Sequence, residues 1–247
     1  MTDFSSLMLI VAVFLLAGAV KGVIGLGLPT VSLGLLTAAF DLPTAMALLI
    51  VPSFVTNAFQ ASTGGHARAI ISRLWPFLLM AGVTVWIGAA ALTRVDSGIL
   101  SGLLGVLLVA YALINLIGIR IAIPASREVW YGPAFGIANG VLTGMTGSFV
   151  VPGVMYLQAI GLSRDMLIQS MGMLFTVSTL ALALALQSNS LLSATDGYIS
   201  AIALAPALVG MVAGQAIRKR LSERLFRRVF FIALLLLGSY IVANAIA

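Results

Sequence analysis

Residues 21–30 have the sequence Lys-Gly-Val-Ile-Gly-Leu-Gly-Leu-Pro-Thr, and residues 139–152 are Asn-Gly-Val-Leu-Thr-Gly-Met-Thr-Gly-Ser-Phe-Val-Val-Pro. In both stretches Gly and Pro interrupt a long apolar segment. Because these residues disfavour a continuous helix, each stretch predicts a break that divides a helical hairpin into short pieces. The piece at residues 28–40 would span only about 20 Å, which is too short to cross the hydrocarbon core of a bilayer.

The composition around these breaks is that of a membrane protein. The chain has 247 residues, of which 61% are hydrophobic and 8% are charged. A soluble domain carries roughly a quarter charged residues, and a disordered chain is rich in charge and poor in apolar residues, so both classes are excluded. With no Cys and one His, the sequence predicts no disulfide, no metal site and no cofactor.

Six apolar segments have lengths close to the roughly 20 residues that cross a bilayer as a helix. They are residues 43–60, 74–93, 97–118, 166–187, 197–217 and 229–246. An intramembrane enzyme would need a cluster of His, Asp, Glu or Cys at membrane depth. The sequence shows no such cluster, so an enzyme is only a distant alternative.

The basic residues indicate how the segments are oriented. Eleven of the 13 fall in loops that alternate with acidic turns, and the positive-inside rule makes these loops cytoplasmic. Arg94 is on the other side, and both termini are predicted to be periplasmic. Since topology accounts for the positive charge, nucleic acid is not expected as a partner. The eleven are Arg68, Arg73, Arg120, Arg127, Arg164, Arg218, Lys219, Arg220, Arg224, Arg227 and Arg228.

This orientation divides the chain into two similar halves, residues 1–118 and 130–247, which a cytoplasmic linker at 119–129 joins. Each half has a broken hairpin, at residues 4–40 or 131–161, followed by three transmembrane helices. An odd number of crossings gives the two halves opposite orientations. The predicted fold is therefore an all-α integral membrane protein with two inverted-topology repeats.

Paired broken helices are typical of a transport site near the middle of the membrane. New helices are expected to begin near Pro29 and Pro152, and their free N–H groups would bind an oxyanion between the two hairpins. Glycines would allow close approach, and hydroxyl groups would add donors. The substrate-binding residues predicted from the breaks are Gly22, Gly25, Gly27, Pro29, Thr30, Asn139, Thr143, Thr146, Gly147, Ser148 and Pro152.

Four further polar residues are candidates for the substrate path. Lys21 lies beside the first break, where a cation within the membrane is costly and typically functional. The alternative is that Lys21 snorkels to an interface. The amides of Asn57, Gln60 and Gln169 are also candidates, although such amides often only join helices by hydrogen bonds.

Other residues have simpler structural interpretations. Glycines four residues apart, at 136, 140 and 144 and at 210 and 214, predict faces on which helices pack closely. Asp41 and Ser163 precede helical segments and are predicted N-caps. Gly-rich outer faces also make a homodimer plausible, and the bilayer itself is an expected partner.

The two broken motifs resemble those of the TauE/SafE family of membrane transporters, the sulfite exporters. The resemblance covers the whole chain, although Thr146-Gly147-Ser148 stands where the family usually has adjacent glycines. It implies outward transport of sulfite or a small organosulfonate such as sulfoacetate across a bacterial inner membrane. The alternative is an uptake permease for another small anion, such as thiosulfate, sulfate or a carboxylate.

Overall fold

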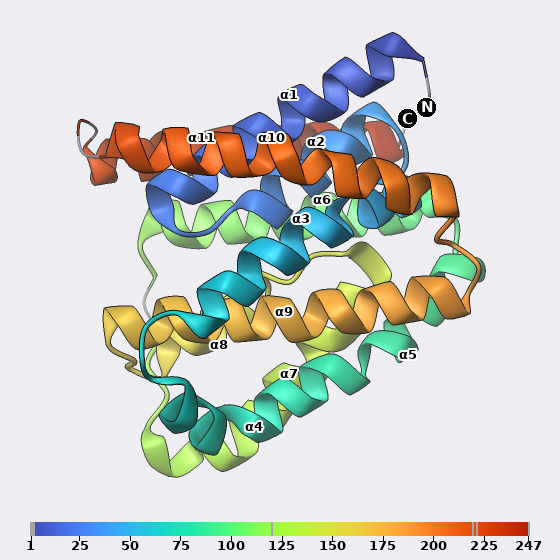
Figure 1. Ribbon diagram of the computed structural model, residues 1–247. Helices are drawn as coiled ribbons and strands as arrows, with labels where there is room; N and C mark the ends of the chain where they lie inside the picture. The colour runs from blue at the N-terminus through green and yellow to red at the C-terminus, as the bar shows by residue number, and fades with distance from the viewer. Residues whose placement is uncertain (1–2, 120, 219, 221, 247) are drawn as a thin grey trace. The chain divides into compact units, whose positions relative to one another are not determined.

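The computed structural model describes residues 3–119, 121–218, 220 and 222–246, and it contains helices and no strand in these ranges (Figure 1). Arg120 and Lys219, two of the basic residues used for topology, lie outside the described residues. Seven of the described helical segments are long and apolar enough to cross a membrane: α1 (Phe4–Ile24), α3 (Leu42–Ser62), Ala67–Thr93, α6 (Ser97–Ile117), α9 (Arg164–Ser188), α10 (Ala194–Arg218) and α11 (Glu223–Ile246).

The segment Ala67–Thr93 is not one continuous helix. It consists of α4 (Ala67–Val83), α5 (Val85–Ala89) and the 3-10 helix η1 (Ala90–Thr93). The remaining helices are shorter: α2 (Leu28–Ala39), α7 (Glu128–Thr146), α8 (Gly153–Ala159) and η2 (Ala125–Arg127). The predicted all-helical membrane fold is confirmed, and all six predicted spans are present as helical segments.

Side-chain caps begin several of these helices. The Thr44 N–H donates to Asp41 Oδ1 at 2.8 Å, and the Met166 N–H donates to Ser163 Oγ at 3.4 Å. Each bond satisfies one of the N–H groups that a helix start leaves without an intrahelical acceptor. The predicted N-caps at Asp41 and Ser163 are confirmed.

The helices form two compact units, and each unit draws helices from both halves of the sequence. Unit 1 comprises residues 1–52, 97–118 and 193–247, and unit 2 comprises residues 53–96 and 119–192. Unit 1 contains the first hairpin, α6, α10 and α11, whereas unit 2 contains the second hairpin, α4, α5 and α9. The division falls within α3 after Pro52.

In unit 1, α1 packs closely against α10, and α6 packs against α11. The α1–α10 contact depends on glycines of both helices. A Cβ atom on Gly22 would lie 2.2 Å from the Met211 carbonyl oxygen, and one on Gly210 would lie 2.0 Å from the Leu15 carbonyl oxygen. The predicted packing face at Gly210 is confirmed. Gly22, a substrate-binding candidate, also lies on this packing face.

A proline inside α3 creates a second contact with α10. Pro52 has no N–H, so the carbonyl of Leu48 lacks its usual helical donor. The buried Ser200 hydroxyl donates to this carbonyl at 2.8 Å and accepts from the Val51 N–H at 3.0 Å. A polar side chain of α10 thus satisfies the interrupted backbone of α3.

In unit 2, α7 packs against α4 and α5 through a row of glycines. A Cβ atom on Gly144 would lie 2.1 Å from the Val85 carbonyl oxygen, and one on Gly140 would lie 2.1 Å from Thr84 Oγ1. The Thr84 hydroxyl, at the junction of α4 and α5, bonds the Met80 and Ile137 carbonyls at 2.7 and 3.1 Å. The predicted packing face at Gly136, Gly140 and Gly144 is confirmed.

One ion pair joins helices of unit 2. Arg73 of α4 bonds both carboxylate oxygens of Glu128 at 2.8 and 2.6 Å, and it also donates to the Ile160 carbonyl at 2.9 Å. This bidentate geometry fixes the start of α7 against α4.

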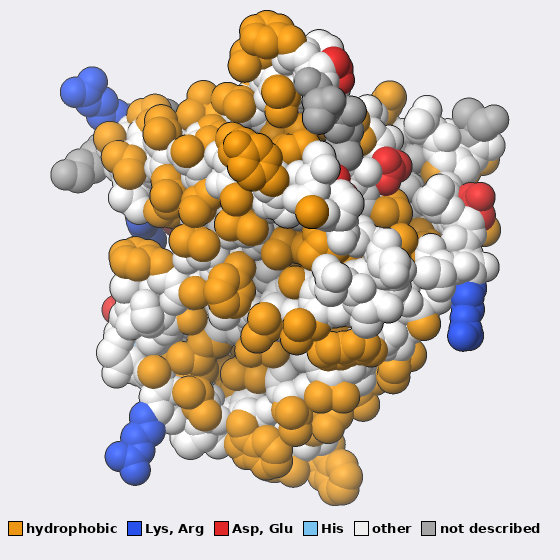
Figure 2. All heavy atoms as spheres, turned by 45° about the vertical axis from the view of Figure 1, so that its right-hand side comes forward, with side chains coloured by type: hydrophobic (Ala, Val, Ile, Leu, Met, Phe, Trp, Pro, Cys, Tyr) orange, Lys and Arg blue, Asp and Glu red, His pale blue; other side chains and the backbone are white. Residues whose placement is uncertain are grey.

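The molecular surface has the apolar character that a bilayer requires. Figure 2 shows that hydrophobic side chains cover much of the visible face and that the few charged side chains lie towards its margins. Many large apolar residues are well exposed, among them Trp86, Ile87, Val212 and Leu236. Contiguous apolar exposure of this kind matches a lipid environment and not water.

Candidate transport site at the hairpin breaks

The first break lies in unit 1 between α1 and α2. Gly25 and Gly27 have φ angles of 78° and 108°, a backbone conformation that favours glycine, and Pro29 lies in the first turn of α2. The predicted break is therefore present, and α2 has the short length expected, with 12 residues. The expectation of short pieces on both sides is wrong for α1, which has 21 residues.

Lys21 lies in the last turn of α1, about 26 Å along the helix from Phe4 at 1.5 Å per residue. Lys21 is only 5% exposed. A cation near a helix C-terminus interacts favourably with the helix dipole. The buried position agrees with a role inside the protein and not with the snorkelling alternative, which needs an exposed ammonium group.

Backbone N–H groups at the start of α2 remain available as donors within unit 1. The first intrahelical bond there runs from the Val31 N–H to the Gly27 carbonyl at 2.8 Å. Leu28 and Thr30 precede this position, so their N–H groups have no acceptor within the helix. Thr30 is buried, at 3% exposed. The predicted helix start is therefore present, and its role in binding an anion stays a prediction.

The second break lies in unit 2 between α7 and α8, and polar side chains hold it in shape. Gly147 has a φ angle of 72° and ends α7. The Thr143 hydroxyl donates to the Ser148 carbonyl at 3.0 Å, and Thr146 Oγ1 accepts from the Ser148 N–H at 3.3 Å. These two hydroxyls therefore stabilise the loop itself.

The second helix start differs from the prediction. Pro152 is the N-cap of α8, which has only seven residues. The Gly153 N–H donates to Asn139 Oδ1 at 2.9 Å, and the Val154 N–H donates to the Val150 carbonyl at 2.9 Å. The expectation of free backbone donors is not met at these two residues, because a side chain and the preceding loop already occupy them.

Asn139 is the residue that connects this break to α7. Its side chain is fully buried, at 0% exposed. The amide oxygen accepts from Gly153, whereas the amide nitrogen Nδ2 has no hydrogen-bond partner among the described residues. Burying a hydrogen-bond donor without an acceptor costs about 1–3 kcal/mol. The Nδ2 group of Asn139 is therefore a candidate donor to a bound polar ligand.

Two hydroxyl groups lie on the face of α9 that contains Leu174, each about 6 Å from it along the helix axis. A Cβ atom on Gly153 would lie 2.4 Å from Asn139 Oδ1 and 2.8 Å from Leu174 Cδ2, so α9 borders the break at Leu174. Ser170 and Ser178 lie one helical turn on either side of Leu174, on the same face of α9. Both are 0% exposed, and neither hydroxyl has a partner in the described structure. The sequence prediction missed both serines.

Gln60 and Gln169 join helices of unit 2 reciprocally. The Gln60 amide of α3 donates to the Ile168 carbonyl at 2.8 Å, and the Gln169 amide of α9 donates to the Ala61 carbonyl at 2.8 Å. Gln169 Oε1 also accepts from the His66 N–H at 2.9 Å. These bonds match the structural alternative for both glutamines. Asn57 is fully buried on α3.

Comparison with known proteins bears on what these breaks do. The family model described as sulfite exporter TauE/SafE matches residues 10–241, which include both hairpin breaks and all the long helices except the first turns of α1 and the last turn of α11. No curated protein and no solved structure matches the chain. Because the match covers nearly the whole sequence, the chain belongs to the TauE/SafE family of sulfite exporter membrane transporters.

Proposed function

We propose that this chain exports a small sulfur-containing oxyanion, sulfite or an organosulfonate such as sulfoacetate, across a bacterial inner membrane. The observation that carries the proposal is the buried amide of Asn139, whose oxygen holds the second hairpin and whose nitrogen has no partner. Ser170 and Ser178 are two more unpartnered hydroxyls in the interior of unit 2. They lie about 12 Å apart along α9, so a small anion could contact at most one of them together with Asn139.

Neutral donors suit a transported anion. A hydrogen bond to a charged group contributes about 1.5–3 kcal/mol, so each such bond recovers part of the cost of removing the anion from water. Amide and hydroxyl groups can donate hydrogen bonds to the oxygen atoms that sulfite and sulfonates have in common. This favours oxyanions over apolar substrates.

The packing of the helices supports an inverted repeat. In unit 1 the opening helix of the first half, α1, packs on α10 of the second half. In unit 2 the opening helix of the second half, α7, packs on α4 and α5 of the first half. Such reciprocal exchange is expected of halves that are related by a pseudo-two-fold axis. We therefore propose that transport proceeds by alternating access of the two repeats.

Outward movement of an anion agrees with the electrical gradient of a bacterial membrane. When an anion leaves an inside-negative cell, its free energy falls by about 2.3 kcal/mol for each negative charge and each 100 mV of membrane potential. The electrical gradient alone therefore drives export, and uniport of the anion is the simplest mechanism.

Sulfite efflux from proteoliposomes tests this function. With purified protein reconstituted and sulfite inside, we expect efflux that accelerates when a potassium diffusion potential makes the interior negative. Liposomes without protein and liposomes with sulfate are the controls. Efflux that does not respond to the potential would contradict uniport, and accumulation of thiosulfate or a carboxylate without sulfite efflux would support an uptake permease instead.

Substitution of Lys21 tests whether its charge acts on the substrate. We expect Lys21→Met to raise the KM for sulfite about tenfold, because loss of one favourable charge interaction of about 1.4 kcal/mol changes an equilibrium by that factor. Lys21→Arg keeps the charge but changes the shape of the donor group, so it separates electrostatics from fit. An unchanged KM in Lys21→Met would show that Lys21 has only a structural role.

A further inference from the structure

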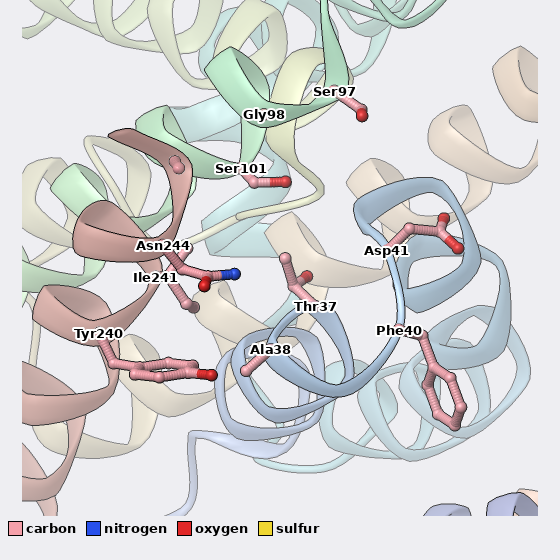
Figure 3. Close-up of a pocket in the computed structure, with 11 residues that line it drawn as sticks. Thr37, Ala38, Phe40, Asp41, Ser97, Gly98, Ser101, Tyr240, Ile241 and Asn244 are labelled. Carbon is pink, nitrogen blue, oxygen red and sulfur yellow. The ribbon is translucent and has the colours of Figure 1, made fainter. Parts of the chain in front are cut away.

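Unit 1 contains a small polar pocket that is separate from the first hairpin break. It lies where the end of α2, the start of α6 and the end of α11 come together (Figure 3). Its cavity volume is about 160 Å³. At about 30 Å³ for each water molecule, this space accommodates one small oxyanion with a few waters. Among the described residues that line it there is no Lys or Arg.

Thr37 is the residue that points to a ligand. It is 8% exposed, and its Oγ1 atom is buried with no hydrogen-bond partner in the described part of the chain. Other helical threonines of this protein, such as Thr146 and Thr179, donate to the carbonyl four residues earlier. The Thr37 hydroxyl makes no such bond and lines the pocket. A buried hydroxyl in this state requires a polar partner.

The other polar groups around the pocket are also neutral donors. Figure 3 shows the Asn244 amide directed towards Thr37 and the Ser101 hydroxyl directed into the same space. The lining also includes Ser97, the first residue of α6. Hydroxyls and an amide can donate hydrogen bonds to an anion.

Asp41 also lines the pocket, but its carboxylate is already occupied. Its Oδ1 accepts from the Thr44 N–H and its Oδ2 accepts from the Thr44 hydroxyl, both at 2.8 Å. In Figure 3 the carboxylate is turned away from Thr37. The negative charge is therefore directed towards the start of α3, which it caps, and the donors face the cavity.

We infer that this pocket binds a small oxyanion of the transported class, at the end of unit 1 that is predicted to be periplasmic. The inference rests on the proposed function. It adds a second binding site on the exit side, distinct from the donors at the hairpin breaks, at which the anion is held by Thr37, Ser101 and Asn244 before release.

The absence of Cys from the sequence allows a direct test on the full chain. Ala245→Cys places a single thiol in the pocket and keeps all three donors, and Ser5→Cys places a control thiol at an exposed position. The labelling rate with a charged maleimide is measured with and without sulfoacetate, which does not react with maleimides. At about four times the dissociation constant, the anion should slow labelling of Ala245→Cys about fivefold and leave Ser5→Cys unchanged.

A second variant distinguishes an anion from a cation. In the pocket cysteine variant, an added Asp41→Asn change keeps a residue that is a good N-cap and removes a negative charge that would repel the anion. The anion should therefore protect the thiol at a lower concentration. Lack of protection by the anion overturns the inference. So does protection that occurs with the sodium salt of the anion but not with its choline salt, because sodium would then be the bound ion. Sulfite flux measured in the same proteoliposomes separates the two claims: flux without protection overturns only the pocket, whereas absence of flux in the wild type overturns the proposed function.

Discussion

Asn139→Asp is expected to reduce sulfite efflux at least about tenfold while the protein remains folded. The substituted carboxylate still offers an oxygen to the Gly153 N–H, which lies 2.9 Å from Asn139 Oδ1. It replaces the unpartnered Nδ2 donor by a second oxygen, which repels an anion. Loss of one hydrogen bond to a charged group, at about 1.5–3 kcal/mol, corresponds to a factor of ten to a hundred.

Efflux from proteoliposomes and thermal unfolding in detergent are measured on the same preparation. Asn189→Asp, at the end of α9, is the matched control, because its amide is part-buried and bonds only the helix backbone at Ala185. The control should keep wild-type efflux. Efflux of Asn139→Asp within about twofold of the wild type, with unchanged unfolding temperature, would exclude the amide nitrogen as a substrate ligand.

Gly88→Ala is expected to cost about 3 kcal/mol of folding stability, the upper end of what overpacking in a filled interior costs. A Cβ atom at this position would lie 1.9 Å from the Val141 carbonyl oxygen and 2.9 Å from the Met145 nitrogen. Both are backbone atoms of α7, so no side chain can rotate to make room. The α5–α7 contact would have to open, and the second hairpin is built on α7.

Gly197→Ala provides the matched control in another helix. Nothing lies within 4 Å of the position of its added Cβ atom. Because Ala favours a helix over Gly by about 1 kcal/mol, this variant should be as stable as the wild type or slightly more stable. Equal unfolding temperatures for Gly88→Ala and Gly197→Ala would show that the α5–α7 contact is not as close as described.

The fold could be predicted from the sequence because its strongest determinants are local. A run of about 20 apolar residues has few alternatives to a membrane helix, and Gly and Pro within such a run interrupt it. The breaks at residues 25–27 and 147–152 therefore appear where the sequence places them. The length of α1 could not be predicted in this way, since an apolar helix ends where its cap lies, here at Gly25.

The candidate site was only partly predictable, because hydrogen bonding between segments is not visible in a sequence. Asn139 was found because it begins the Gly-rich stretch 139–152, although in the structure it lies inside α7, two turns before the break at Gly147. Ser170 and Ser178 were missed, since a serine in an apolar helix usually bonds its own backbone. Their spacing of eight residues, two turns of one helix face, was the available signal. Gln60 and Gln169 were candidates whose partners only the fold reveals.

Gly22 illustrates the same limit for glycine. Its place beside the first break suggests contact with a ligand, but its Cα lies against the backbone of α10 at Met211 and Gly214. Sequence alone does not distinguish a glycine that admits a ligand from one that admits another helix. The regular spacing of Gly136, Gly140 and Gly144 did identify a packing face correctly.

The most direct test of the central claim, that the hairpin breaks hold the transported oxyanion, is a crystal structure with selenite in place of sulfite. Selenium gives an anomalous signal that locates the anion without assumptions about its chemistry. We expect a peak within hydrogen-bonding distance of Asn139 Nδ2, at the second hairpin break. Bound selenite elsewhere in the protein, with no anomalous peak at either hairpin break, would contradict it.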